Sequence, residues 1–274
     1  MDKLFMRRWG YTLVGIIPKF KFLVNRFLRF LFKPWSNIYY RWDWFKRPFS
    51  LCNCVFRTSD GFMFKVYDGD SMPGSHELRL HKALQKYVGR GSIFFDIGAH
   101  VGGFTIRASR IVGNEGLVIA FEPNFRNYYY LMQNIYINRC RNVIALPLAV
   151  HSATGTILSF NISTRSGHSS ITELHKDEIL FKTYVYTITI DDVVKVLSLT
   201  RVNAIKIDVE GAEIEVLKGA KNTLDKYRPT LLIEVHGEKQ WKLLKEMLQG
   251  YIVNIVHELP HHQWPKHILA LPRR

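Results

Sequence analysis

Residues 94–105 read FFDIGAHVGGFT, and this stretch indicates the fold. A short apolar run ends in a glycine-rich turn, and a helical pattern follows the turn. Glycine lets the main chain approach a ligand closely, and free N–H groups at the start of a helix favour polar or negative partners. Many doubly wound α/β proteins share this pattern, so the residues around it must indicate what is bound.

From residue 93 onward, apolar runs alternate with helical patterns, which is typical of βαβ units on a parallel sheet. The predicted strands are Ile93–Ile97, Leu117–Phe121, Val143–Pro147, Ala204–Asp208 and Thr230–Val235, and the predicted helices are 103–112, 125–138, 213–225 and 238–248. Two further strands, Tyr251–Val256 and His267–Leu271, are expected to form a closing hairpin that adds an antiparallel strand. The long gap before Ala204 contains two strand-like runs and a short helix after Asp191, and the runs are Thr156–Ile162 and Tyr184–Ile190. We therefore predict an α/β fold with a mostly parallel sheet.

The chain divides into three predicted parts: a basic aromatic extension (1–50), a hairpin and helix (51–92) and the α/β domain (93–274). The hairpin is expected from Val55–Thr58 and Phe62–Val66, which flank a Ser-Asp-Gly turn signal at residues 59–61. The helix is expected over 76–88. With 274 residues and 47% hydrophobic content, the chain can bury one large core, which excludes a wholly disordered protein.

The N-terminal extension concentrates positive charge. Residues 1–48 hold eleven basic and two acidic side chains, a net charge of +9 out of +15 for the chain. Phe20, Leu23, Val24, Phe27, Leu28 and Leu31 recur there at helical spacing. Interleaved aromatic and basic residues suit a membrane surface, an RNA strand or packing against the sheet, and we favour the membrane surface.

No membrane span or secretory signal is expected in this extension. Its longest uncharged run, Trp9 to Pro18, is far shorter than the roughly 20 residues that cross a bilayer, and no cleavage site follows it. Cys52, Cys54 and Cys140 cannot form a disulfide framework or a closed zinc site. We predict a cytoplasmic protein that can associate peripherally with the inner face of the membrane.

Two carboxylates near the glycine-rich turn indicate the cofactor. Asp96 stands two residues before Gly98, where a nucleotide diphosphate would disfavour negative charge. Glu122 follows the next strand, 24 residues past Gly98, where an acid can accept both ribose hydroxyl protons. A ribose-containing cofactor with a positively charged, phosphate-free tail fits this pair better than NAD, and S-adenosylmethionine is such a cofactor.

These motifs, with several others in order, resemble the FkbM family of S-adenosylmethionine-dependent methyltransferases. The resemblance covers roughly residues 55–272 and rests on residues 96–105 (DIGAHVGGFT), Phe121-Glu122-Pro123, Ser166–Ser170, Thr189–Asp192, Ile205–Glu213, Leu217–Ala220 and Leu232–His236. It implies a Rossmann-like seven-stranded sheet in which the last hairpin reverses direction. One departure is His100, where the family commonly has Asn.

The resemblance also implies where the cofactor lies. Asp96, Gly98 and Gly102 would shape the methionine side of the pocket, and Glu122 would hold the ribose. The adenine is expected near Ala149 and Val150. The predicted cofactor-binding set is completed by Ala99, His100 and Pro123.

Acidic residues and a histidine follow the fourth and fifth predicted strands of the sheet. Asp208 and Glu210 lie at the first of these ends, and Glu234 and His236 lie at the second with the two-residue spacing that puts both side chains on one side. An alcohol acceptor needs a base, and His236 is the predicted general base. Asp208 or Glu210 would orient His236 or bind the acceptor.

The predicted activity is methyl transfer to an acceptor oxygen, and the resemblance implies a hydroxyl on a sugar, glycolipid or natural product. Asp208, Glu234 and His236 would also suit a divalent metal, which we do not favour. The remaining histidines are expected to be solvent-exposed in loops: His168, His257, His261, His262 and His267. Two alternatives stay open, a nucleic-acid methyltransferase that uses the basic arm and a non-catalytic binding module.

Overall fold

The computed structural model describes residues 12–14, 54–67, 80, 85–173, 176–258, 264 and 266–273. The apolar pattern at 20–31, His261, His262 and most of the predicted helix 76–88 lie outside these residues. Within that predicted helix Leu80 is helical, whereas 85–87 form a turn. Among the described residues, no helix is both long and apolar enough to cross a membrane.

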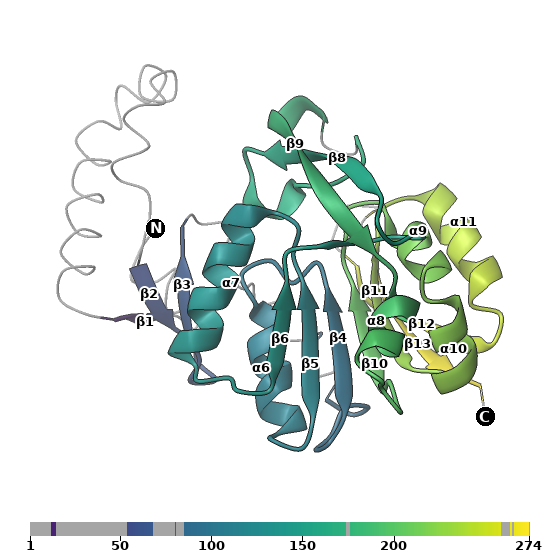
Figure 1. Ribbon diagram of the computed structural model, residues 1–274, viewed down its shortest axis with the longest axis horizontal. Helices are drawn as coiled ribbons and strands as arrows, with labels where there is room; N and C mark the ends of the chain where they lie inside the picture. Colours follow the sequence, from purple (N-terminus) through teal and green to yellow (C-terminus); the bar gives the residue numbers. More distant parts are fainter. Residues whose placement is uncertain are drawn as a thin grey trace.

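A seven-stranded sheet forms the centre of the fold, in the order β12-β13-β11-β10-β4-β5-β6 (Figure 1). Its strands are β4 (Ile93–Ile97), β5 (Leu117–Phe121), β6 (Val143–Leu146), β10 (Ala204–Ile207), β11 (Thr230–Val235), β12 (Tyr251–Glu258) and β13 (Lys266–Pro272). The pairs among β11, β10, β4, β5 and β6 are parallel, and β13 runs antiparallel to both β11 and β12. The predicted fold class, with its reversed C-terminal hairpin strand, is therefore confirmed.

Helices cover both faces of the sheet. They are α6 (Gly103–Val112), α7 (Phe125–Ile137), α8 (Ile190–Val196), α9 (Glu213–Lys218), α10 (Lys221–Tyr227) and α11 (Glu238–Met247). Successive strand residues point to opposite faces. Phe95 accordingly joins the core that includes residues of α8, α9 and α11, whereas Phe94 packs with residues of α6.

Two small sheets flank the central one. β2 (Cys54–Arg57) pairs antiparallel with β1 (Thr12–Val14) and with β3 (Met63–Val66), which confirms the predicted hairpin. β3 is joined to α7, because Asn138 Oδ1 accepts a hydrogen bond from the Met63 N–H at 2.9 Å and Asn134 Oδ1 accepts one from the Lys65 N–H at 2.6 Å. The second sheet contains β7 (Ala149–Val150), β8 (Ile157–Ser163) and β9 (Ile179–Ile188), with the 3₁₀ turns η2 (Ser166–His168) and η3 (Lys176–Glu178) between β8 and β9.

Two predicted elements differ from the structure. The helix predicted over 213–225 is divided into α9 and α10 at Gly219, whose backbone lies so close to His151 that a Cβ would be 2.1 Å from the His151 carbonyl oxygen. The strand predicted over Tyr184–Ile190 begins five residues earlier, and Ile190 already belongs to α8. The Thr189 side chain ends the strand there, because it accepts a hydrogen bond from the Asp192 N–H at 3.0 Å and caps the helix.

Candidate active site

A cavity of about 390 Å³ lies at the carboxyl ends of the central strands, where open α/β sheets bind ligands. One part is lined by the glycine-rich turn and the end of β5: Gly98, Ala99, His100, Glu122 and Pro123. Another part is lined by Asp208, Glu210 and Glu234, and residues 165–171 also line the cavity. The predicted cofactor-binding turn and the predicted acceptor end therefore share one cavity.

The glycine-rich turn depends on backbone that only glycine adopts without strain. Gly98 has φ +75°, and a Cβ there would lie 1.8 Å from the Asp208 carbonyl oxygen. The N–H groups of Gly98 and Ala99 both donate to the Phe121 carbonyl oxygen, at 3.0 and 2.9 Å. Gly102 has φ +96° and precedes α6, but it is not among the residues that line the cavity.

Glu122 is buried and lines the cavity beside this turn. Its Oε2 accepts a hydrogen bond from the His100 N–H at 2.7 Å, and its Oε1 accepts one from the Asn124 N–H at 2.9 Å. Burial raises the pKa of Glu122 to about 7, although both N–H groups favour the ionised form. A carboxylate oxygen has two lone pairs, so each can still accept a ribose hydroxyl proton.

Asp96 lies behind the turn rather than in the cavity. It is fully buried and does not line the cavity; its Oδ2 accepts a hydrogen bond from Thr105 Oγ1 at 2.5 Å. Burial raises the pKa of Asp96, and the nearby Lys206 ammonium opposes that rise. Asp96 thus supports the turn from inside the core, whereas Glu122 faces the cavity.

Lys206 connects these groups, although no motif predicted a role for it. The Lys206 Nζ donates to the Gly98 carbonyl oxygen at 2.7 Å and lies 3.1 Å from Asp208 Oδ2 and 3.6 Å from Asp96 Oδ1. Only 6% of Lys206 is exposed. The available signal was a lysine inside the otherwise apolar strand Ala204–Ile207, because a buried ammonium must be paired.

Asp208 and Glu234 form a carboxylate pair in the cavity. Burial would raise the pKa of Asp208, but the Lys206 ammonium and a hydrogen bond from Glu234 hold it below its usual value. Burial and the neighbouring Asp208 raise the pKa of Glu234. His267 Nε2 lies 3.5 Å from Glu234 Oε2. His267 is buried because it belongs to β13, where it pairs with Glu234 of β11. The expectation of an exposed His267 was therefore wrong.

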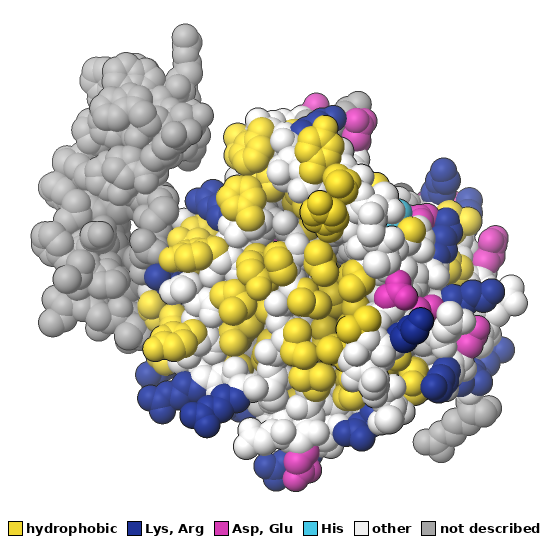
Figure 2. All heavy atoms as spheres, viewed as in Figure 1, with side chains coloured by type: hydrophobic (Ala, Val, Ile, Leu, Met, Phe, Trp, Pro, Cys, Tyr) yellow, Lys and Arg dark blue, Asp and Glu magenta, His cyan; other side chains and the backbone are white. Residues whose placement is uncertain are grey.

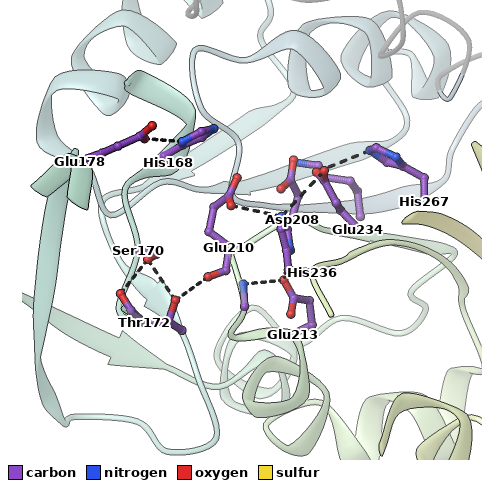
Figure 3. Close-up of polar contacts among 12 residues, drawn as sticks. His168, Ser170, Thr172, Glu178, Asp208, Glu210, Glu213, Glu234, His236 and His267 are labelled. Atoms are coloured by element: carbon purple, nitrogen blue, oxygen red, sulfur yellow. Dashed lines mark hydrogen bonds and ion pairs between the residues drawn. The ribbon is translucent and has the colours of Figure 1, made fainter. Parts of the chain in front are cut away.

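His236 lies between two glutamates (Figure 3). Its Nδ1 is 2.9 Å from Glu213 Oε1 and its Nε2 is 3.1 Å from Glu210 Oε2. Burial alone would lower the pKa of His236, but hydrogen bonds to Glu210 and Glu213 raise it to about 11. The imidazole is therefore protonated at neutral pH. His236 is also absent from the residues that line the cavity. Glu213 is fully buried and was missed from the sequence because it follows Glu210 on a helix start that acids commonly occupy.

Glu210 itself has a strained backbone. Its φ is +53°, which is uncommon for a residue with a side chain, and the Thr172 hydroxyl donates to its carbonyl oxygen at 2.7 Å. Such strain persists only where the surroundings impose it, and it is concentrated at functional sites. The strain and the contact with His236 together hold the Glu210 carboxylate at the cavity.

Segment 165–171 is joined to the rest of the site by side-chain hydrogen bonds. His168 Nδ1 lies 2.6 Å from Glu178 Oε2, the Asn127 side chain donates to the Ser166 carbonyl oxygen at 3.1 Å, and the Asn124 side chain donates to Ser169 Oγ at 3.0 Å. His168 was expected to be a solvated loop histidine; it is instead half-buried, paired and part of the cavity lining. The sequence gives no local signal for the Glu178 contact.

The alternative metal ligands do lie together. Asp208, Glu234 and His236 offer ligand atoms within 4.8 Å of one another. A histidine binds a metal through the lone pair of a neutral imidazole. Glu210 and Glu213 engage both nitrogens of His236, so a metal at this cluster would have to displace a proton and one of these contacts.

The sheet order, the glycine-rich turn after β4 and the acid at the end of β5 define a Rossmann-like protein of the methyltransferase class. Residues 96–256 match the family model described as the methyltransferase FkbM domain. The chain belongs to this family, as its motifs predicted, and S-adenosylmethionine is the cofactor that the family membership supports.

Several known proteins are similar to this chain. Hexuronic acid methyltransferase AglP from Haloferax volcanii is 30% identical over 146 residues, which are 53% of this chain and 56% of that protein. The crystal structure of methyltransferase FkbM from Methylobacillus flagellatus is 18% identical with a TM-score of 0.48, over 66% of this chain and 44% of that one. M. jannaschii TYW2 in complex with AdoMet is 18% identical with a TM-score of 0.46, over 79% and 83%. The chain thus spans only about half the length of the first two proteins.

Proposed function

We propose that the protein transfers a methyl group from S-adenosylmethionine to a hydroxyl oxygen of a sugar, glycolipid or natural product. The observation that carries this proposal is the single cavity lined both by Glu122 with the glycine-rich turn and by Asp208, Glu210 and Glu234. Carboxylates are natural partners for the several hydroxyls of a sugar. A sugar acceptor is also favoured by the similarity to a hexuronic acid methyltransferase.

The residues around the turn fit the cofactor. Gly98 lets the turn pack against the Asp208 carbonyl oxygen, where a Cβ would collide, and Glu122 lines the cavity with lone pairs for two ribose hydroxyls. S-adenosylmethionine supplies an electrophilic methyl group on a positively charged sulfur when it is bound. Ala99, His100 and Pro123 would complete the walls of this subsite.

Asp208 is the proposed proton acceptor for the acceptor hydroxyl. It lines the cavity, and its carbonyl oxygen lies directly beside Gly98. The Lys206 ammonium keeps its carboxylate ionised. A hydroxyl oxygen becomes strongly acidic as it gains a methyl group, so a carboxylate of low pKa is a sufficient base. Protonated His236 cannot accept this proton, and we assign it the role of positioning Glu210, which would bind the acceptor.

The test uses a deuterated methyl donor. The purified full-length chain is incubated with S-adenosylmethionine labelled in the methyl group and with glycan, glycolipid and RNA extracts, and products are identified by mass spectrometry. A labelled methyl ether on a glycan or glycolipid supports the proposal. Label only in RNA would establish a nucleic-acid methyltransferase, and no label in any extract, with S-adenosylhomocysteine still bound, would favour a binding module.

Donor binding should depend on pH through Glu122. Because burial raises the pKa of Glu122 to about 7, its carboxylate is mostly ionised at pH 8 and mostly protonated at pH 6. Only the ionised carboxylate offers all its lone pairs to the ribose hydroxyls. The Kd for S-adenosylhomocysteine should therefore rise by about tenfold when the pH falls from 8 to 6. Isothermal titration calorimetry at both pH values measures the change.

The matched variants are Glu122→Gln and Glu246→Gln, the second an exposed glutamate on α11. Glu122→Gln should bind more weakly and lose the pH dependence, whereas Glu246→Gln should behave as the wild type. A wild-type Kd that is constant from pH 6 to pH 8 contradicts the assigned ribose contact.

Removal of divalent metal should leave methyl transfer unchanged. The reason is that both nitrogens of His236 are engaged as donors to Glu210 and Glu213, so the cluster lacks a neutral imidazole ligand. Initial rates are compared before and after dialysis against EDTA. Loss of activity that Mg²⁺ or Mn²⁺ restores would show instead that Asp208 and Glu234 are metal ligands.

A further inference from the structure

Helix α7 exposes an apolar stripe along its length. Phe125, Tyr129, Met132 and Tyr136 follow one another at intervals of four, three and four residues, which places them on one face of the helix. The exposed fractions of these four residues range from 42% to 82%. Among the described residues, no other element covers this stripe.

The hairpin of β8 and β9 exposes a second set of apolar side chains. Ile157 pairs with Tyr186, so the two share one side of the hairpin, and Tyr184 lies two residues along on the same side. These residues are 55%, 61% and 75% exposed. Phe160, on the opposite side, is buried and lines the cavity.

The two sets belong to one face of the molecule. Figure 2 shows hydrophobic side chains gathered from the region of α7 across that of β6 to the β8–β9 hairpin, with no acidic side chain among them. The turn that follows β8 is joined to the start of α7 through the Asn124–Ser169 hydrogen bond. Contiguous apolar patches of this kind mark interaction sites on soluble proteins. We call the exposed apolar residues described above the apolar face: Phe125, Tyr129, Met132, Tyr136, Ile157, Tyr184 and Tyr186.

The helix and strands of the apolar face carry basic but no acidic side chains, and Glu173, Asp177 and Glu178 lie in the connection between β8 and β9. Residues 123–150, which contain α7 and β6, include no Asp or Glu, and their arginines, Arg126, Arg139 and Arg141, are all exposed. The strands β8 and β9 likewise include no acid and one exposed lysine, Lys182. A partner for this face should therefore be both apolar and negatively charged.

The chain's own segment 15–53 is a poor match for this face. It holds eight basic residues and one acidic residue, so it carries the same sign of charge. It connects β1 to β2, and β3 of the same sheet bonds to Asn134 and Asn138 on the side of α7 opposite the exposed stripe. Because both the segment and the apolar face are rich in basic residues, their charges disfavour contact between them.

We propose that the apolar face binds a membrane surface that contains anionic lipids. The side chains of Met132 and Ile157 have no ring that could stack on an RNA base, but they are stabilised by contact with lipid hydrocarbon. This favours a lipid partner over a nucleic acid. The arginines would meet the anionic headgroups. This proposal concerns a surface outside the cavity and does not depend on methyl transfer.

The test is co-sedimentation of the full-length chain with vesicles of phosphatidylcholine alone and of phosphatidylcholine with phosphatidylglycerol. The wild type should bind the anionic vesicles more tightly than the neutral ones. The double variant Tyr136→Ser/Tyr184→Ser should weaken binding to anionic vesicles by about tenfold or more, because both rings leave the interface. Arg139→Glu/Arg141→Glu should weaken it by a similar factor and remove the preference for anionic lipid.

The matched controls lie at the opposite end of the sheet. Ile252→Ser on β12 and Lys239→Glu on α11 change one exposed apolar and one exposed basic residue and should bind vesicles as the wild type does. Equal sedimentation of the face variants and the wild type would overturn the proposal. So would a wild type that ignores vesicles but forms a dimer, or binds RNA, through the same residues.

Discussion

Asp208→Asn is expected to lower kcat by about 10²- to 10⁴-fold, the range that positioned acid–base groups contribute. Asparagine keeps the size of the side chain but cannot take the proton of the acceptor hydroxyl. Because Asp208 lines the cavity beside the glycine-rich turn rather than touching Glu122, the Kd for S-adenosylhomocysteine should change little. Initial rates with labelled donor and calorimetric binding of the product measure the two effects separately.

Two comparisons make this result specific. Asp225→Asn changes an exposed aspartate on α10 in the same way and should leave kcat unaltered. The wild-type kcat should also show no loss centred near pH 6.5, because Asp208 stays ionised well below that pH and His236 stays protonated well above it. With donor at saturating concentration, a kcat that falls on acidification with a midpoint near 6.5 would restore a histidine as the base.

Lys206→Met is expected to lower the free energy of unfolding by about 3–5 kcal/mol at pH 8, the usual cost of removing one partner of a buried ion pair. Without the ammonium, the fully buried Asp96 carboxylate loses its counter-charge, and the Gly98 carbonyl oxygen loses its 2.7 Å hydrogen bond. Urea denaturation measures the loss. Lys239→Met, which removes an exposed lysine of α11, should have almost no effect.

The pH dependence of this deficit identifies its cause. Burial already raises the pKa of Asp96 above its unfolded value, and removing Lys206 raises it further. A group of this kind stabilises the fold at low pH, and that stability is lost as the pH rises through its folded pKa. The deficit of Lys206→Met should therefore shrink between pH 8 and pH 5. A deficit that is constant over this range would indicate lost packing rather than an uncompensated carboxylate.

The sequence alone was sufficient for the local structure of the sheet. Apolar runs bounded by glycine and polar residues gave the observed limits of β4, β5, β11 and α6, because side-chain period and turn residues act over a few positions. The glycine-rich turn and Glu122 were recognisable for the same reason, since each follows directly from a strand end. The division of the predicted helix 213–225 was not, because it depends on His151, which is distant in sequence.

The charge states in the site were decided only by tertiary structure. His236 resembles a general base in sequence, but Glu213, which is 23 residues away, and Glu210 bond both of its nitrogens and keep it protonated. Lys206 became recognisable as the link between Gly98 and Asp208 only when β4 and β10 paired in parallel register. Motifs thus determined which residues gather at the strand ends, whereas burial and long-range pairing determined which of them are ionised, because a pKa depends on neighbours that local sequence does not specify.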